Sequence, residues 1–385
     1  MKIDALDLDR SPVLRPTAEA TGLPNEFYVD EQLFRLERDQ LFARGWTCVG
    51  VGAELPLPGD LWPIELIDMP LLMVRGRDGV VRVFHNVCSH RGVRLVDRPG
   101  QAPVIRCPYH SWAYDLEGRL VRTPDIGGTG IDFVAGLDPA DMGLRPVRTG
   151  QWLDFIFVNL TGDAEPLEDW LAPLKVRWAH YRLDLLRHAA AADFTIEANW
   201  KLATENTVEF YHLPWIHKDL NSYSPTEAHY FCNAGDRFVG TATRDYRPSA
   251  TGDLALPCFP NLSPDEALVG EYPVVFPNLW LGVQADHFFA LVVYPVSARL
   301  TRERQHIYFV GDEAMSERLR PLREEIIERW RRINVEDIDI TEALQRGRAS
   351  LGFDGGRLSP VQDFGNHHFQ RMVVQALART SAERR

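Results

Sequence analysis

Two short segments of the sequence carry the same pair of metal-binding residue types. They are CSHRG at residues 88–92 and CPYHSW at residues 107–112, and sixteen residues separate the histidine of the first from the cysteine of the second. Each segment offers one thiolate and one imidazole. Two cysteines on one iron and two histidines on the other hold a [2Fe-2S] cluster whose neutral imidazoles raise its reduction potential. The predicted cluster ligands are Cys88, His90, Cys107 and His110.

Two other interpretations compete for these segments. Structural zinc also uses cysteine and histidine, but its common spacing pairs C-x2-4-C with H-x3-5-H rather than one thiolate and one imidazole in each loop. The four side chains could also be unrelated core residues. The mixed ligand types, the similar design of both loops and the flanking glycine, proline and aromatic residues favour the iron–sulfur cluster.

Composition limits the class of protein and the partners that can be expected. The chain has 385 residues, of which 45% are hydrophobic and 25% charged, so two or three folded domains are expected rather than a collagen-like, coiled-coil or disordered protein. Its net charge of −12 argues against nucleic acid or an anionic membrane as partner. Five cysteines are few and odd in number, which disfavours a disulfide framework.

The N-terminus predicts a cytoplasmic protein. The segment MKIDALDLDR is acidic where a secretory signal would be apolar, and the longest apolar run, residues 288–296, is too short to span a bilayer. A cytoplasmic location is the expectation from these two observations.

Hydrophobic patterning predicts an α+β chain. Residues 46–158 contain short β segments at 61–67, 71–75, 80–85 and 104–106, with a hairpin turn at 77–79. After residue 166 the pattern alternates. Helices are expected at 167–187, 200–213, 317–332 and 335–346, and strands at 193–199, 272–276, 279–283, 288–294 and 306–310.

A second group of metal-binding residues falls in the expected helix 200–213. Glu205, Glu209 and His212 are spaced to share one helical face. His217 would point away from that face on an unbroken helix, but Pro214 should end the helix and let the chain bring His217 back to the same metal.

A carboxylate would complete a two-histidine, one-carboxylate triad, which holds Fe(II) and leaves positions open for dioxygen. Asp337 is the preferred candidate because it begins a helical segment with a partly apolar face. Glu336 and Asp339 are its nearby competitors.

Over nearly its full length the sequence resembles the terminal oxygenase (α) subunits of Rieske non-heme iron oxygenases. Ser111 stands where that family usually has glycine. The matching parts are Leu23-Pro24, Phe27-Tyr28, the two cluster loops, residues 199–217, and Glu336-Asp337 followed by Glu342 and Gln345.

The resemblance implies a division into an N-terminal segment (1–42) packed on the catalytic domain, a small antiparallel Rieske [2Fe-2S] domain (43–158) and a mononuclear iron catalytic domain (159–385) with an antiparallel sheet surrounded by helices. It implies His212, His217 and Asp337 as iron ligands. It also implies a homotrimer in which Glu209 bridges the cluster of one subunit, through His110, to the iron of its neighbour.

The function expected from the resemblance is O2 activation at Fe(II) with electrons from an NAD(P)H-dependent reductase, directly or through a ferredoxin. The substrate would be a small organic molecule, either aromatic and hydroxylated, or a quaternary or tertiary amine and demethylated. The alternative is a non-enzymatic Rieske electron carrier with a degenerate second domain. The substrate and the presence of a β subunit stay open.

Aromatic residues are candidates for a cage around a quaternary ammonium, although most should be core residues. Trp215 and residues 221–223 are expected to approach the substrate most closely. The tryptophans considered are Trp62, Trp112, Trp152, Trp200, Trp215 and Trp280.

Overall fold

A computed structural model describes residues 10–383, without the side chains of residues 379–383. The chain forms two compact units. The smaller is Trp46–Ala164, and the larger combines the segments before and after it in the sequence. Residues 1–9 of the expected N-terminal segment lie outside the described part. The α+β class is confirmed.

The smaller unit consists of antiparallel sheets. Its main sheet follows the order β1 (Thr47–Val51), β10 (Phe155–Asn159), β9 (Pro146–Trp152), β4 (Val81–His85), β3 (Met69–Arg75), β2 (Asp60–Leu66) and β5 (Gly100–Gln101). A second sheet contains β6 (Ile105–Arg106), β7 (Ala113–Tyr114) and β8 (Leu120–Arg122). The turn between β3 and β4 places Gly79 at φ +78°, where glycine is favoured.

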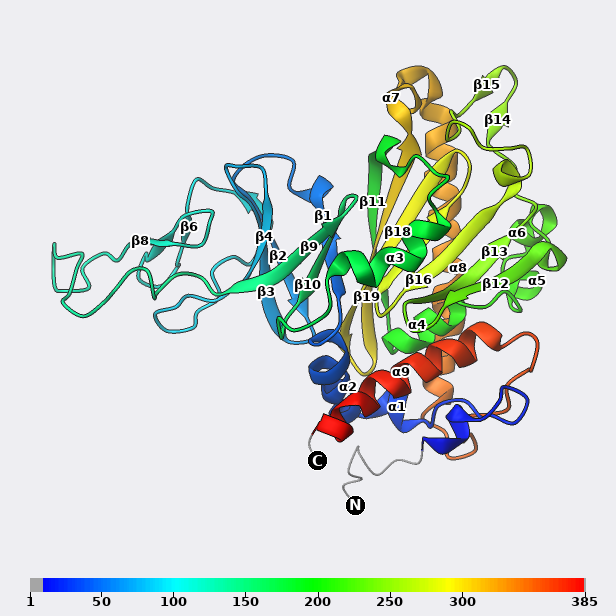
Figure 1. The fold of residues 1–385 in the computed structure, drawn as a ribbon, viewed down its shortest axis with the longest axis horizontal. Helices are drawn as coiled ribbons and strands as arrows, with labels where there is room; N and C mark the ends of the chain where they lie inside the picture. The colour runs from blue at the N-terminus through cyan, green and yellow to red at the C-terminus, as the bar shows by residue number, and fades with distance from the viewer. Residues whose placement is uncertain (1–9, 384–385) are drawn as a thin grey trace. The chain divides into compact units, whose positions relative to one another are not determined.

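A seven-stranded antiparallel sheet forms the centre of the larger unit (Figure 1). Its order is β11 (Leu186–Ile196), β19 (Leu300–Val310), β18 (His287–Ser297), β17 (Leu279–Val283), β16 (Gly270–Val275), β13 (Phe238–Thr243) and β12 (His229–Ala234). Strand β17 is buried throughout, as expected for its continuous apolar run.

One long helix lies along this sheet, α8 (Arg320–Gly347), shown in orange in Figure 1. Two separate helices at 317–332 and 335–346 were expected, and that prediction is wrong. No proline or glycine lies in the four residues Arg332–Val335 where a break was expected. Ion pairs at i,i+4 spacing, Arg320–Glu324 and Arg329–Glu325, stabilise the first half of this helix.

The helix expected over 167–187 is shorter than the pattern suggested. Helix α3 (Leu167–Arg177) ends where two residues donate to the carboxylate of Glu271, Arg177 at 2.7 and 2.8 Å and Trp178 at 2.7 Å. The chain then enters β11, whose Leu186 pairs with Val310 of β19. Tertiary contacts rather than local propensity therefore set this boundary.

Helix α4 (Trp200–Thr207) is bonded to the helices that precede the smaller unit, α1 (Glu26–Val29) and α2 (Glu31–Glu37). The Tyr28 hydroxyl donates to Glu205 Oε1 at 2.5 Å. Lys201 Nζ pairs with Glu37 Oε1 at 2.6 Å, and both side chains are fully buried. Glu205 therefore belongs to the buried polar contacts that join α4 to α1 and α2.

The remaining helices are short or terminal. They are α5 (Leu213–Ile216), α6 (Lys218–Tyr223), α7 (Gly311–Ala314) and α9 (Phe364–Glu383), and a two-stranded sheet joins β14 (Ala250–Thr251) to β15 (Leu254–Ala255). None of the helices within residues 10–383 combines the length and hydrophobicity that crossing a bilayer requires.

Candidate metal centres

The expected helix 200–213 is interrupted just before its metal-binding residues. Helix α4 ends at Thr207, so Glu209 and His212 lie beyond it, and the prediction of one shared helical face is wrong. Glu209 explains the interruption. Its Oε2 accepts hydrogen bonds from the backbone N–H groups of Tyr211 and His212, the second at 3.2 Å. A side chain that caps these donors favours starting a new helical turn.

His212 and His217 flank the short helix α5. Pro214 lies in the first turn of α5, so it helps to begin this helix rather than to end α4. The break falls at His217, whose backbone has φ −100° and ψ 61° between α5 and α6. The two imidazoles lie edge to face, with ring centroids 5.1 Å apart. His212 and His217 therefore converge as expected, but the break at His217 brings them together rather than an end of the helix at Pro214.

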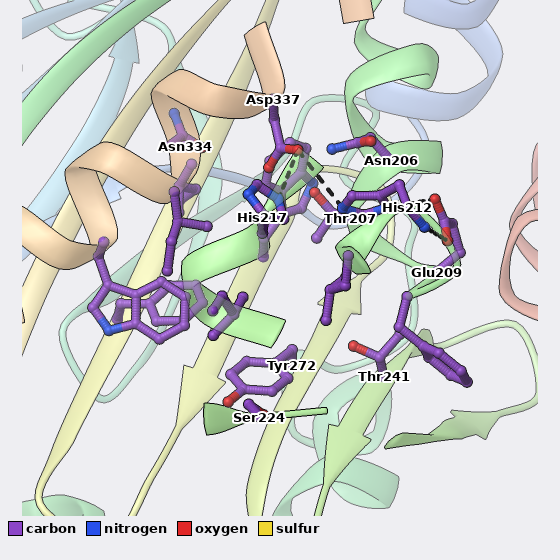
Figure 2. Close-up of a pocket in the computed structure, with 18 of the residues that line it drawn as sticks. Asn206, Thr207, Glu209, His212, His217, Ser224, Thr241, Tyr272, Asn334 and Asp337 are labelled. Atoms are coloured by element: carbon purple, nitrogen blue, oxygen red, sulfur yellow. Dashed lines mark hydrogen bonds and ion pairs between the residues drawn. The ribbon is translucent and has the colours of Figure 1, made fainter. Parts of the chain in front are cut away.

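Asp337 completes a compact group with the two histidines. Candidate ligand atoms of His212, His217 and Asp337 all lie within 4.8 Å of one another. Asp337 Oδ1 is 2.9 Å from His217 Nε2 and 3.7 Å from His212 Nε2, yet this oxygen has no partner of hydrogen-bond geometry among the described residues. Three ligand atoms directed at a common point fit a metal better than they fit one another (Figure 2).

Two further carboxylates bind the opposite sides of the imidazoles. Glu209 Oε1 lies 2.5 Å from His212 Nδ1, and Glu336 Oε2 lies 2.7 Å from His217 Nδ1. A carboxylate on Nδ1 fixes the tautomer that leaves Nε2 free for a metal. The geometry therefore separates the competitors, because Asp337 faces Nε2 and Glu336 supports His217 from behind.

The protonation of His217 follows from these neighbours. Burial by itself lowers the pKa of His217, but Asp337 and Glu336 outweigh it and the pKa is raised above its ordinary value. A metal ion would therefore compete with a proton for His217.

A cavity of about 120 Å³ opens beside the three residues. Its floor is the central sheet, where Trp280, Leu291 and Gln305 lie side by side on β17, β18 and β19. In Figure 2, Tyr272, Ser224 and Thr241 lie on the far side of the cavity from Asp337. The aromatic members of the lining are Phe210, Tyr272, Trp280, Phe289 and Trp330.

Trp330 is held in the cavity wall by a buried chain of polar groups. Its indole N–H donates to His287 Nε2 at 2.7 Å, and His287 Nδ1 lies 2.8 Å from Asp286 Oδ1. Tyr246 and the backbone N–H of Ser249 donate to the same carboxylate. The indole face lies against Phe289, with ring centroids 4.1 Å apart.

In the smaller unit, the two loops that carry the expected cluster ligands have the same pattern of backbone hydrogen bonds. Cys88 N–H donates to Val93 O and Gly92 N–H to Cys88 O; in the other loop Cys107 N–H donates to Trp112 O and Ser111 N–H to Cys107 O. Gly92 and Ser111 thus hold equivalent positions, with φ +72° and +57°. Ser111, which stands where the family usually has glycine, therefore adopts a backbone conformation that favours glycine.

The four expected cluster ligands gather between these loops. The rings of His90 and His110 lie 4.9 Å apart, and His110 Nδ1 is buried without a hydrogen-bond partner in the described residues. Burial raises the pKa of the Cys88 thiol, the neighbouring Cys107 raises it further, and Tyr114 Oη lies 3.1 Å from its sulfur. An orphaned imidazole nitrogen beside two buried thiols fits a cluster that binds these atoms.

Some residues of the cavity lining were predicted wrongly or missed in the sequence. Trp215 is 71% exposed and does not line the cavity, so its expected approach to the substrate is wrong. Of the six tryptophans considered, only Trp280 is in the lining. Trp330 and Tyr272 were missed. Trp330 could have been found from its spacing, since it precedes Asp337 by two helical turns on the same helix.

The structure thus has two loops that each offer one cysteine and one histidine to a cluster, and a group of two histidines and one carboxylate. Together these two sites define an iron-dependent oxygenase. Comparison with known families agrees. Residues 45–133 match the Rieske [2Fe-2S] domain, and residues 183–379 match the catalytic domain of the ring hydroxylating alpha subunit. The chain belongs to the family of Rieske oxygenase α subunits. Membership indicates a Rieske cluster and a mononuclear iron, and favours an enzyme over an electron carrier with a degenerate second domain.

Named relatives are similar over most of the chain. The carnitine monooxygenase oxygenase subunit of Escherichia coli (strain K12) is 30% identical over 93% of this chain and 94% of its own. The glycine betaine monooxygenase oxygenase subunit of Pseudomonas aeruginosa (strain UCBPP-PA14) is 27% identical over 93% and 89%. A crystal structure of the quaternary ammonium Rieske monooxygenase CntA with L-carnitine superposes with TM-score 0.77, at 26% identity and 96% and 99% coverage.

Proposed function

We propose that the chain is an oxygenase component that hydroxylates or N-demethylates a small quaternary or tertiary alkylammonium compound. The observation that carries this proposal is the convergence of His212, His217 and Asp337 at the edge of an aromatic cavity. Relatives named for carnitine and glycine betaine support the amine over an aromatic hydrocarbon.

The geometry described above supports a set of proposed metal ligands. Cys88, His90, Cys107 and His110 would hold the Rieske cluster, and His212, His217 and Asp337 would hold iron. When bound, the cluster supplies single electrons and the iron activates dioxygen. Glu209 and Glu336 orient the two iron-binding imidazoles by fixing their Nδ1 protons.

The aromatic wall suits an alkylammonium group. The rings of Tyr272, Phe289 and Trp330 lie within 6.2 Å of one another, and such ring faces attract a desolvated cation. The cavity volume of about 120 Å³ approaches that of an engineered cavity of about 150 Å³ that admits benzene, so the group that enters must be small.

Glu209 is proposed as the bridge between metal centres of adjacent subunits in a homotrimer. One of its oxygens is bound to His212 and the other to two backbone N–H groups. His110 of a neighbouring subunit would have to approach this carboxylate from outside. Electrons would come from NAD(P)H through a reductase, with or without a ferredoxin. A cytoplasmic location is likewise proposed.

Metal counting on matched variants tests the ligand assignment. The wild-type chain should hold roughly three irons and two acid-labile sulfides. Asp337→Asn should lower iron to roughly two with sulfide unchanged, whereas Glu336→Gln should retain the third iron with an affinity reduced about 10- to 100-fold. Equal losses in both variants would contradict the assignment.

Turnover then tests the substrate class. With reductant and dioxygen, an N-demethylase releases formaldehyde from trimethylammonium compounds in amounts that match the dioxygen consumed, and Asp337→Asn should release none. Stoichiometric oxidation of aromatic compounds without activity on any alkylammonium would refute the proposal.

A further inference from the structure

Trp330 and Trp280 both line the cavity, but their indole nitrogens have different surroundings. The Trp330 N–H donates to His287 Nε2 at 2.7 Å, whereas the buried indole nitrogen of Trp280 has no hydrogen-bond partner in the described part of the chain. An imidazole nitrogen with a lone pair is a base, so it can take a proton as well as accept a hydrogen bond. Of the two tryptophans, Trp330 is therefore the one whose indole proton has a base to receive it.

Asp286 prepares His287 to receive that proton. Burial by itself raises the pKa of Asp286, but hydrogen bonds from His287, Tyr246 and the backbone of Ser249 outweigh it, and the pKa is lowered. The ionised carboxylate can only accept, so His287 Nδ1, 2.8 Å from Asp286 Oδ1, donates and Nε2 keeps its lone pair. A fully buried carboxylate on Nδ1 also stabilises the imidazolium that forms when Nε2 is protonated, as it does in catalytic triads.

Tyr246 links these buried groups to the solvent. Its hydroxyl donates to Asp286 Oδ1 at 2.5 Å, and the centroids of the Tyr246 and His287 rings lie 5.9 Å apart. Tyr246 itself is partly exposed. Burial and the charge of Asp286 raise the pKa of Tyr246 well above its ordinary value, so the phenol keeps its proton at neutral pH. Tryptophan and tyrosine are the aromatic side chains that lose one electron most readily, and here one hydrogen-bonded network joins them.

The chemistry proposed for this cavity gives such a network a task. Trp330 and Asp337 both line the cavity and lie two turns apart on α8. Dioxygen chemistry that starts at the iron without an organic compound in place leaves a strong oxidant that nothing consumes. Electrons tunnel readily over a separation of this size through a packed protein interior, so Trp330 lies within reach of that oxidant.

We propose that Trp330, His287, Asp286 and Tyr246 form a one-electron path that carries oxidising equivalents out of the cavity when no organic substrate consumes them. The inference rests on the proposed function for the source of the oxidant. It goes beyond that function because it assigns these residues to protection of the protein rather than to oxidation of the substrate. Oxidation is directed to two residues that a reductant in the solvent can restore, and away from the metal-binding histidines.

Each step of the path conserves electrons and protons. Trp330 gives one electron to the oxidant and its indole proton to His287, which leaves a neutral indolyl radical beside an imidazolium. Tyr246 then gives an electron to this radical and its phenolic proton to Asp286, while His287 returns its proton to the indole nitrogen. A thiol in the solvent reduces the tyrosyl radical, which regains its proton from Asp286. Two thiols that have each lost an electron and a proton combine as a disulfide.

Electron paramagnetic resonance of rapidly frozen samples tests the path. Iron-loaded protein is mixed with hydrogen peroxide in the absence of thiol and of organic substrate, so that the oxidant forms without electrons from the cluster. The wild-type protein should show a radical signal that narrows when the protein contains ring-deuterated tyrosine. Tyr246→Phe should abolish this tyrosyl signal and raise severalfold the share of Trp330 that peptide mass spectrometry finds oxygenated. A tyrosyl signal that persists in Tyr246→Phe overturns the inference.

His287→Gln separates this redox role from a structural one. Glutamine keeps an acceptor for the indole hydrogen bond but no base, so the radical yield should fall at least roughly tenfold. Tyr308→Phe is the control and should leave the signal unchanged, because Tyr308 lies on the opposite face of β19 from the cavity residue Gln305. Equal yields in wild type and His287→Gln overturn the inference. A wild-type protein that forms no radical but releases formaldehyde from a trimethylammonium compound overturns the inference alone, and one that does neither refutes the proposed function as well.

Discussion

Ser111 is the clearest case of a single residue in an unfavourable backbone conformation. It has φ +57°, while Gly92 occupies the matching position of the other loop at φ +72°. The left-handed region costs a residue with a Cβ roughly 1–2 kcal/mol, and glycine avoids this cost. The two loops therefore provide a reciprocal pair of substitutions at one structural position.

Ser111→Gly should stabilise the smaller unit by up to about 1 kcal/mol, since the strain relieved exceeds the entropy that glycine loses. Gly92→Ser should destabilise it by a similar amount through the backbone alone, because an added Cβ would meet nothing within 4 Å. Denaturant unfolding followed by the visible absorbance of the cluster measures both. Changes of the same sign in the two variants would contradict the equivalence of the loops.

Glu303 is a buried carboxyl group beside the iron site. Its side chain accepts a hydrogen bond from Asn334 at 3.1 Å, and its other oxygen has no partner among the described residues. Burial raises the pKa of Glu303 from 4.5 to about 8, and the charge of Asp337 also raises it. The folded protein thus keeps a proton here that the unfolded chain releases.

The free energy of unfolding of metal-free protein should therefore fall as the pH rises from about 4.5 to 8, and this contribution should level off above pH 8. Glu303→Gln removes the effect, so the variant should gain stability relative to wild type by up to about 1.4 kcal/mol per pH unit in this window. Urea unfolding with a chelator present measures the difference. Glu328→Gln, on the exposed side of α8, is the control, and a pH-independent difference for Glu303→Gln would contradict the interpretation.

At the scale of elements, the strands were predictable and several helix boundaries were not. The apolar runs at 279–283 and 288–294 correspond to β17 and β18, because buried strands are recognisable from continuous hydrophobicity. The break after α4 depends on the Glu209 carboxylate binding backbone donors, and the end of α3 depends on Glu271, a residue distant in sequence. Neither the local capping by Glu209 nor the tertiary contact of Glu271 leaves a periodic signal in the sequence.

The candidate site also has residues that the sequence predicted and residues that it did not. Local spacing within the two loops indicated the four cluster ligands, and the pattern around residues 212–217 indicated two histidines. The partly apolar helix face already favoured Asp337 over Glu336, and the structure separates them by which imidazole nitrogen each one faces. The floor of the cavity could not be predicted, because strand pairing brings Trp280, Leu291 and Gln305 together from three strands.

The contact between α8 and the sheet also depends on His287, which accepts the Trp330 indole hydrogen bond. His287→Leu should weaken binding of a trimethylammonium compound between about threefold and thirtyfold, because the indole loses the partner that fixes its ring face toward the cavity. His287→Gln, whose side-chain oxygen can accept the same bond, should restore most of the affinity. Calorimetry measures both, and unchanged affinity in His287→Leu would rule out a role for this hydrogen bond in binding.

At the scale of the whole molecule, the proposed trimer predicts complementation between defective chains. Cys88→Ala should lack the cluster and Asp337→Asn the iron, so each alone should be inactive. Co-expressed in equal amounts and assembled at random, mixed trimers should recover about a quarter of wild-type activity, because half of the chains keep the iron site and half of their donor neighbours keep the cluster.

Mixing the two purified variants after assembly is the control and should recover nothing unless subunits exchange. Activity that stays absent after co-expression, with mixed assembly verified by affinity tags on one chain, would contradict electron transfer between subunits.

Helix α8 carries both Trp330 in the cavity wall and Asp337 at the metal group. Seven residues, about 10.5 Å along the helix axis, separate them. An α-helix behaves as a nearly inextensible rod at this length, so a guest that pushes the indole outward would drag the carboxylate along with it. Binding of an organic compound against Trp330 would thereby move Asp337, a proposed ligand of the metal.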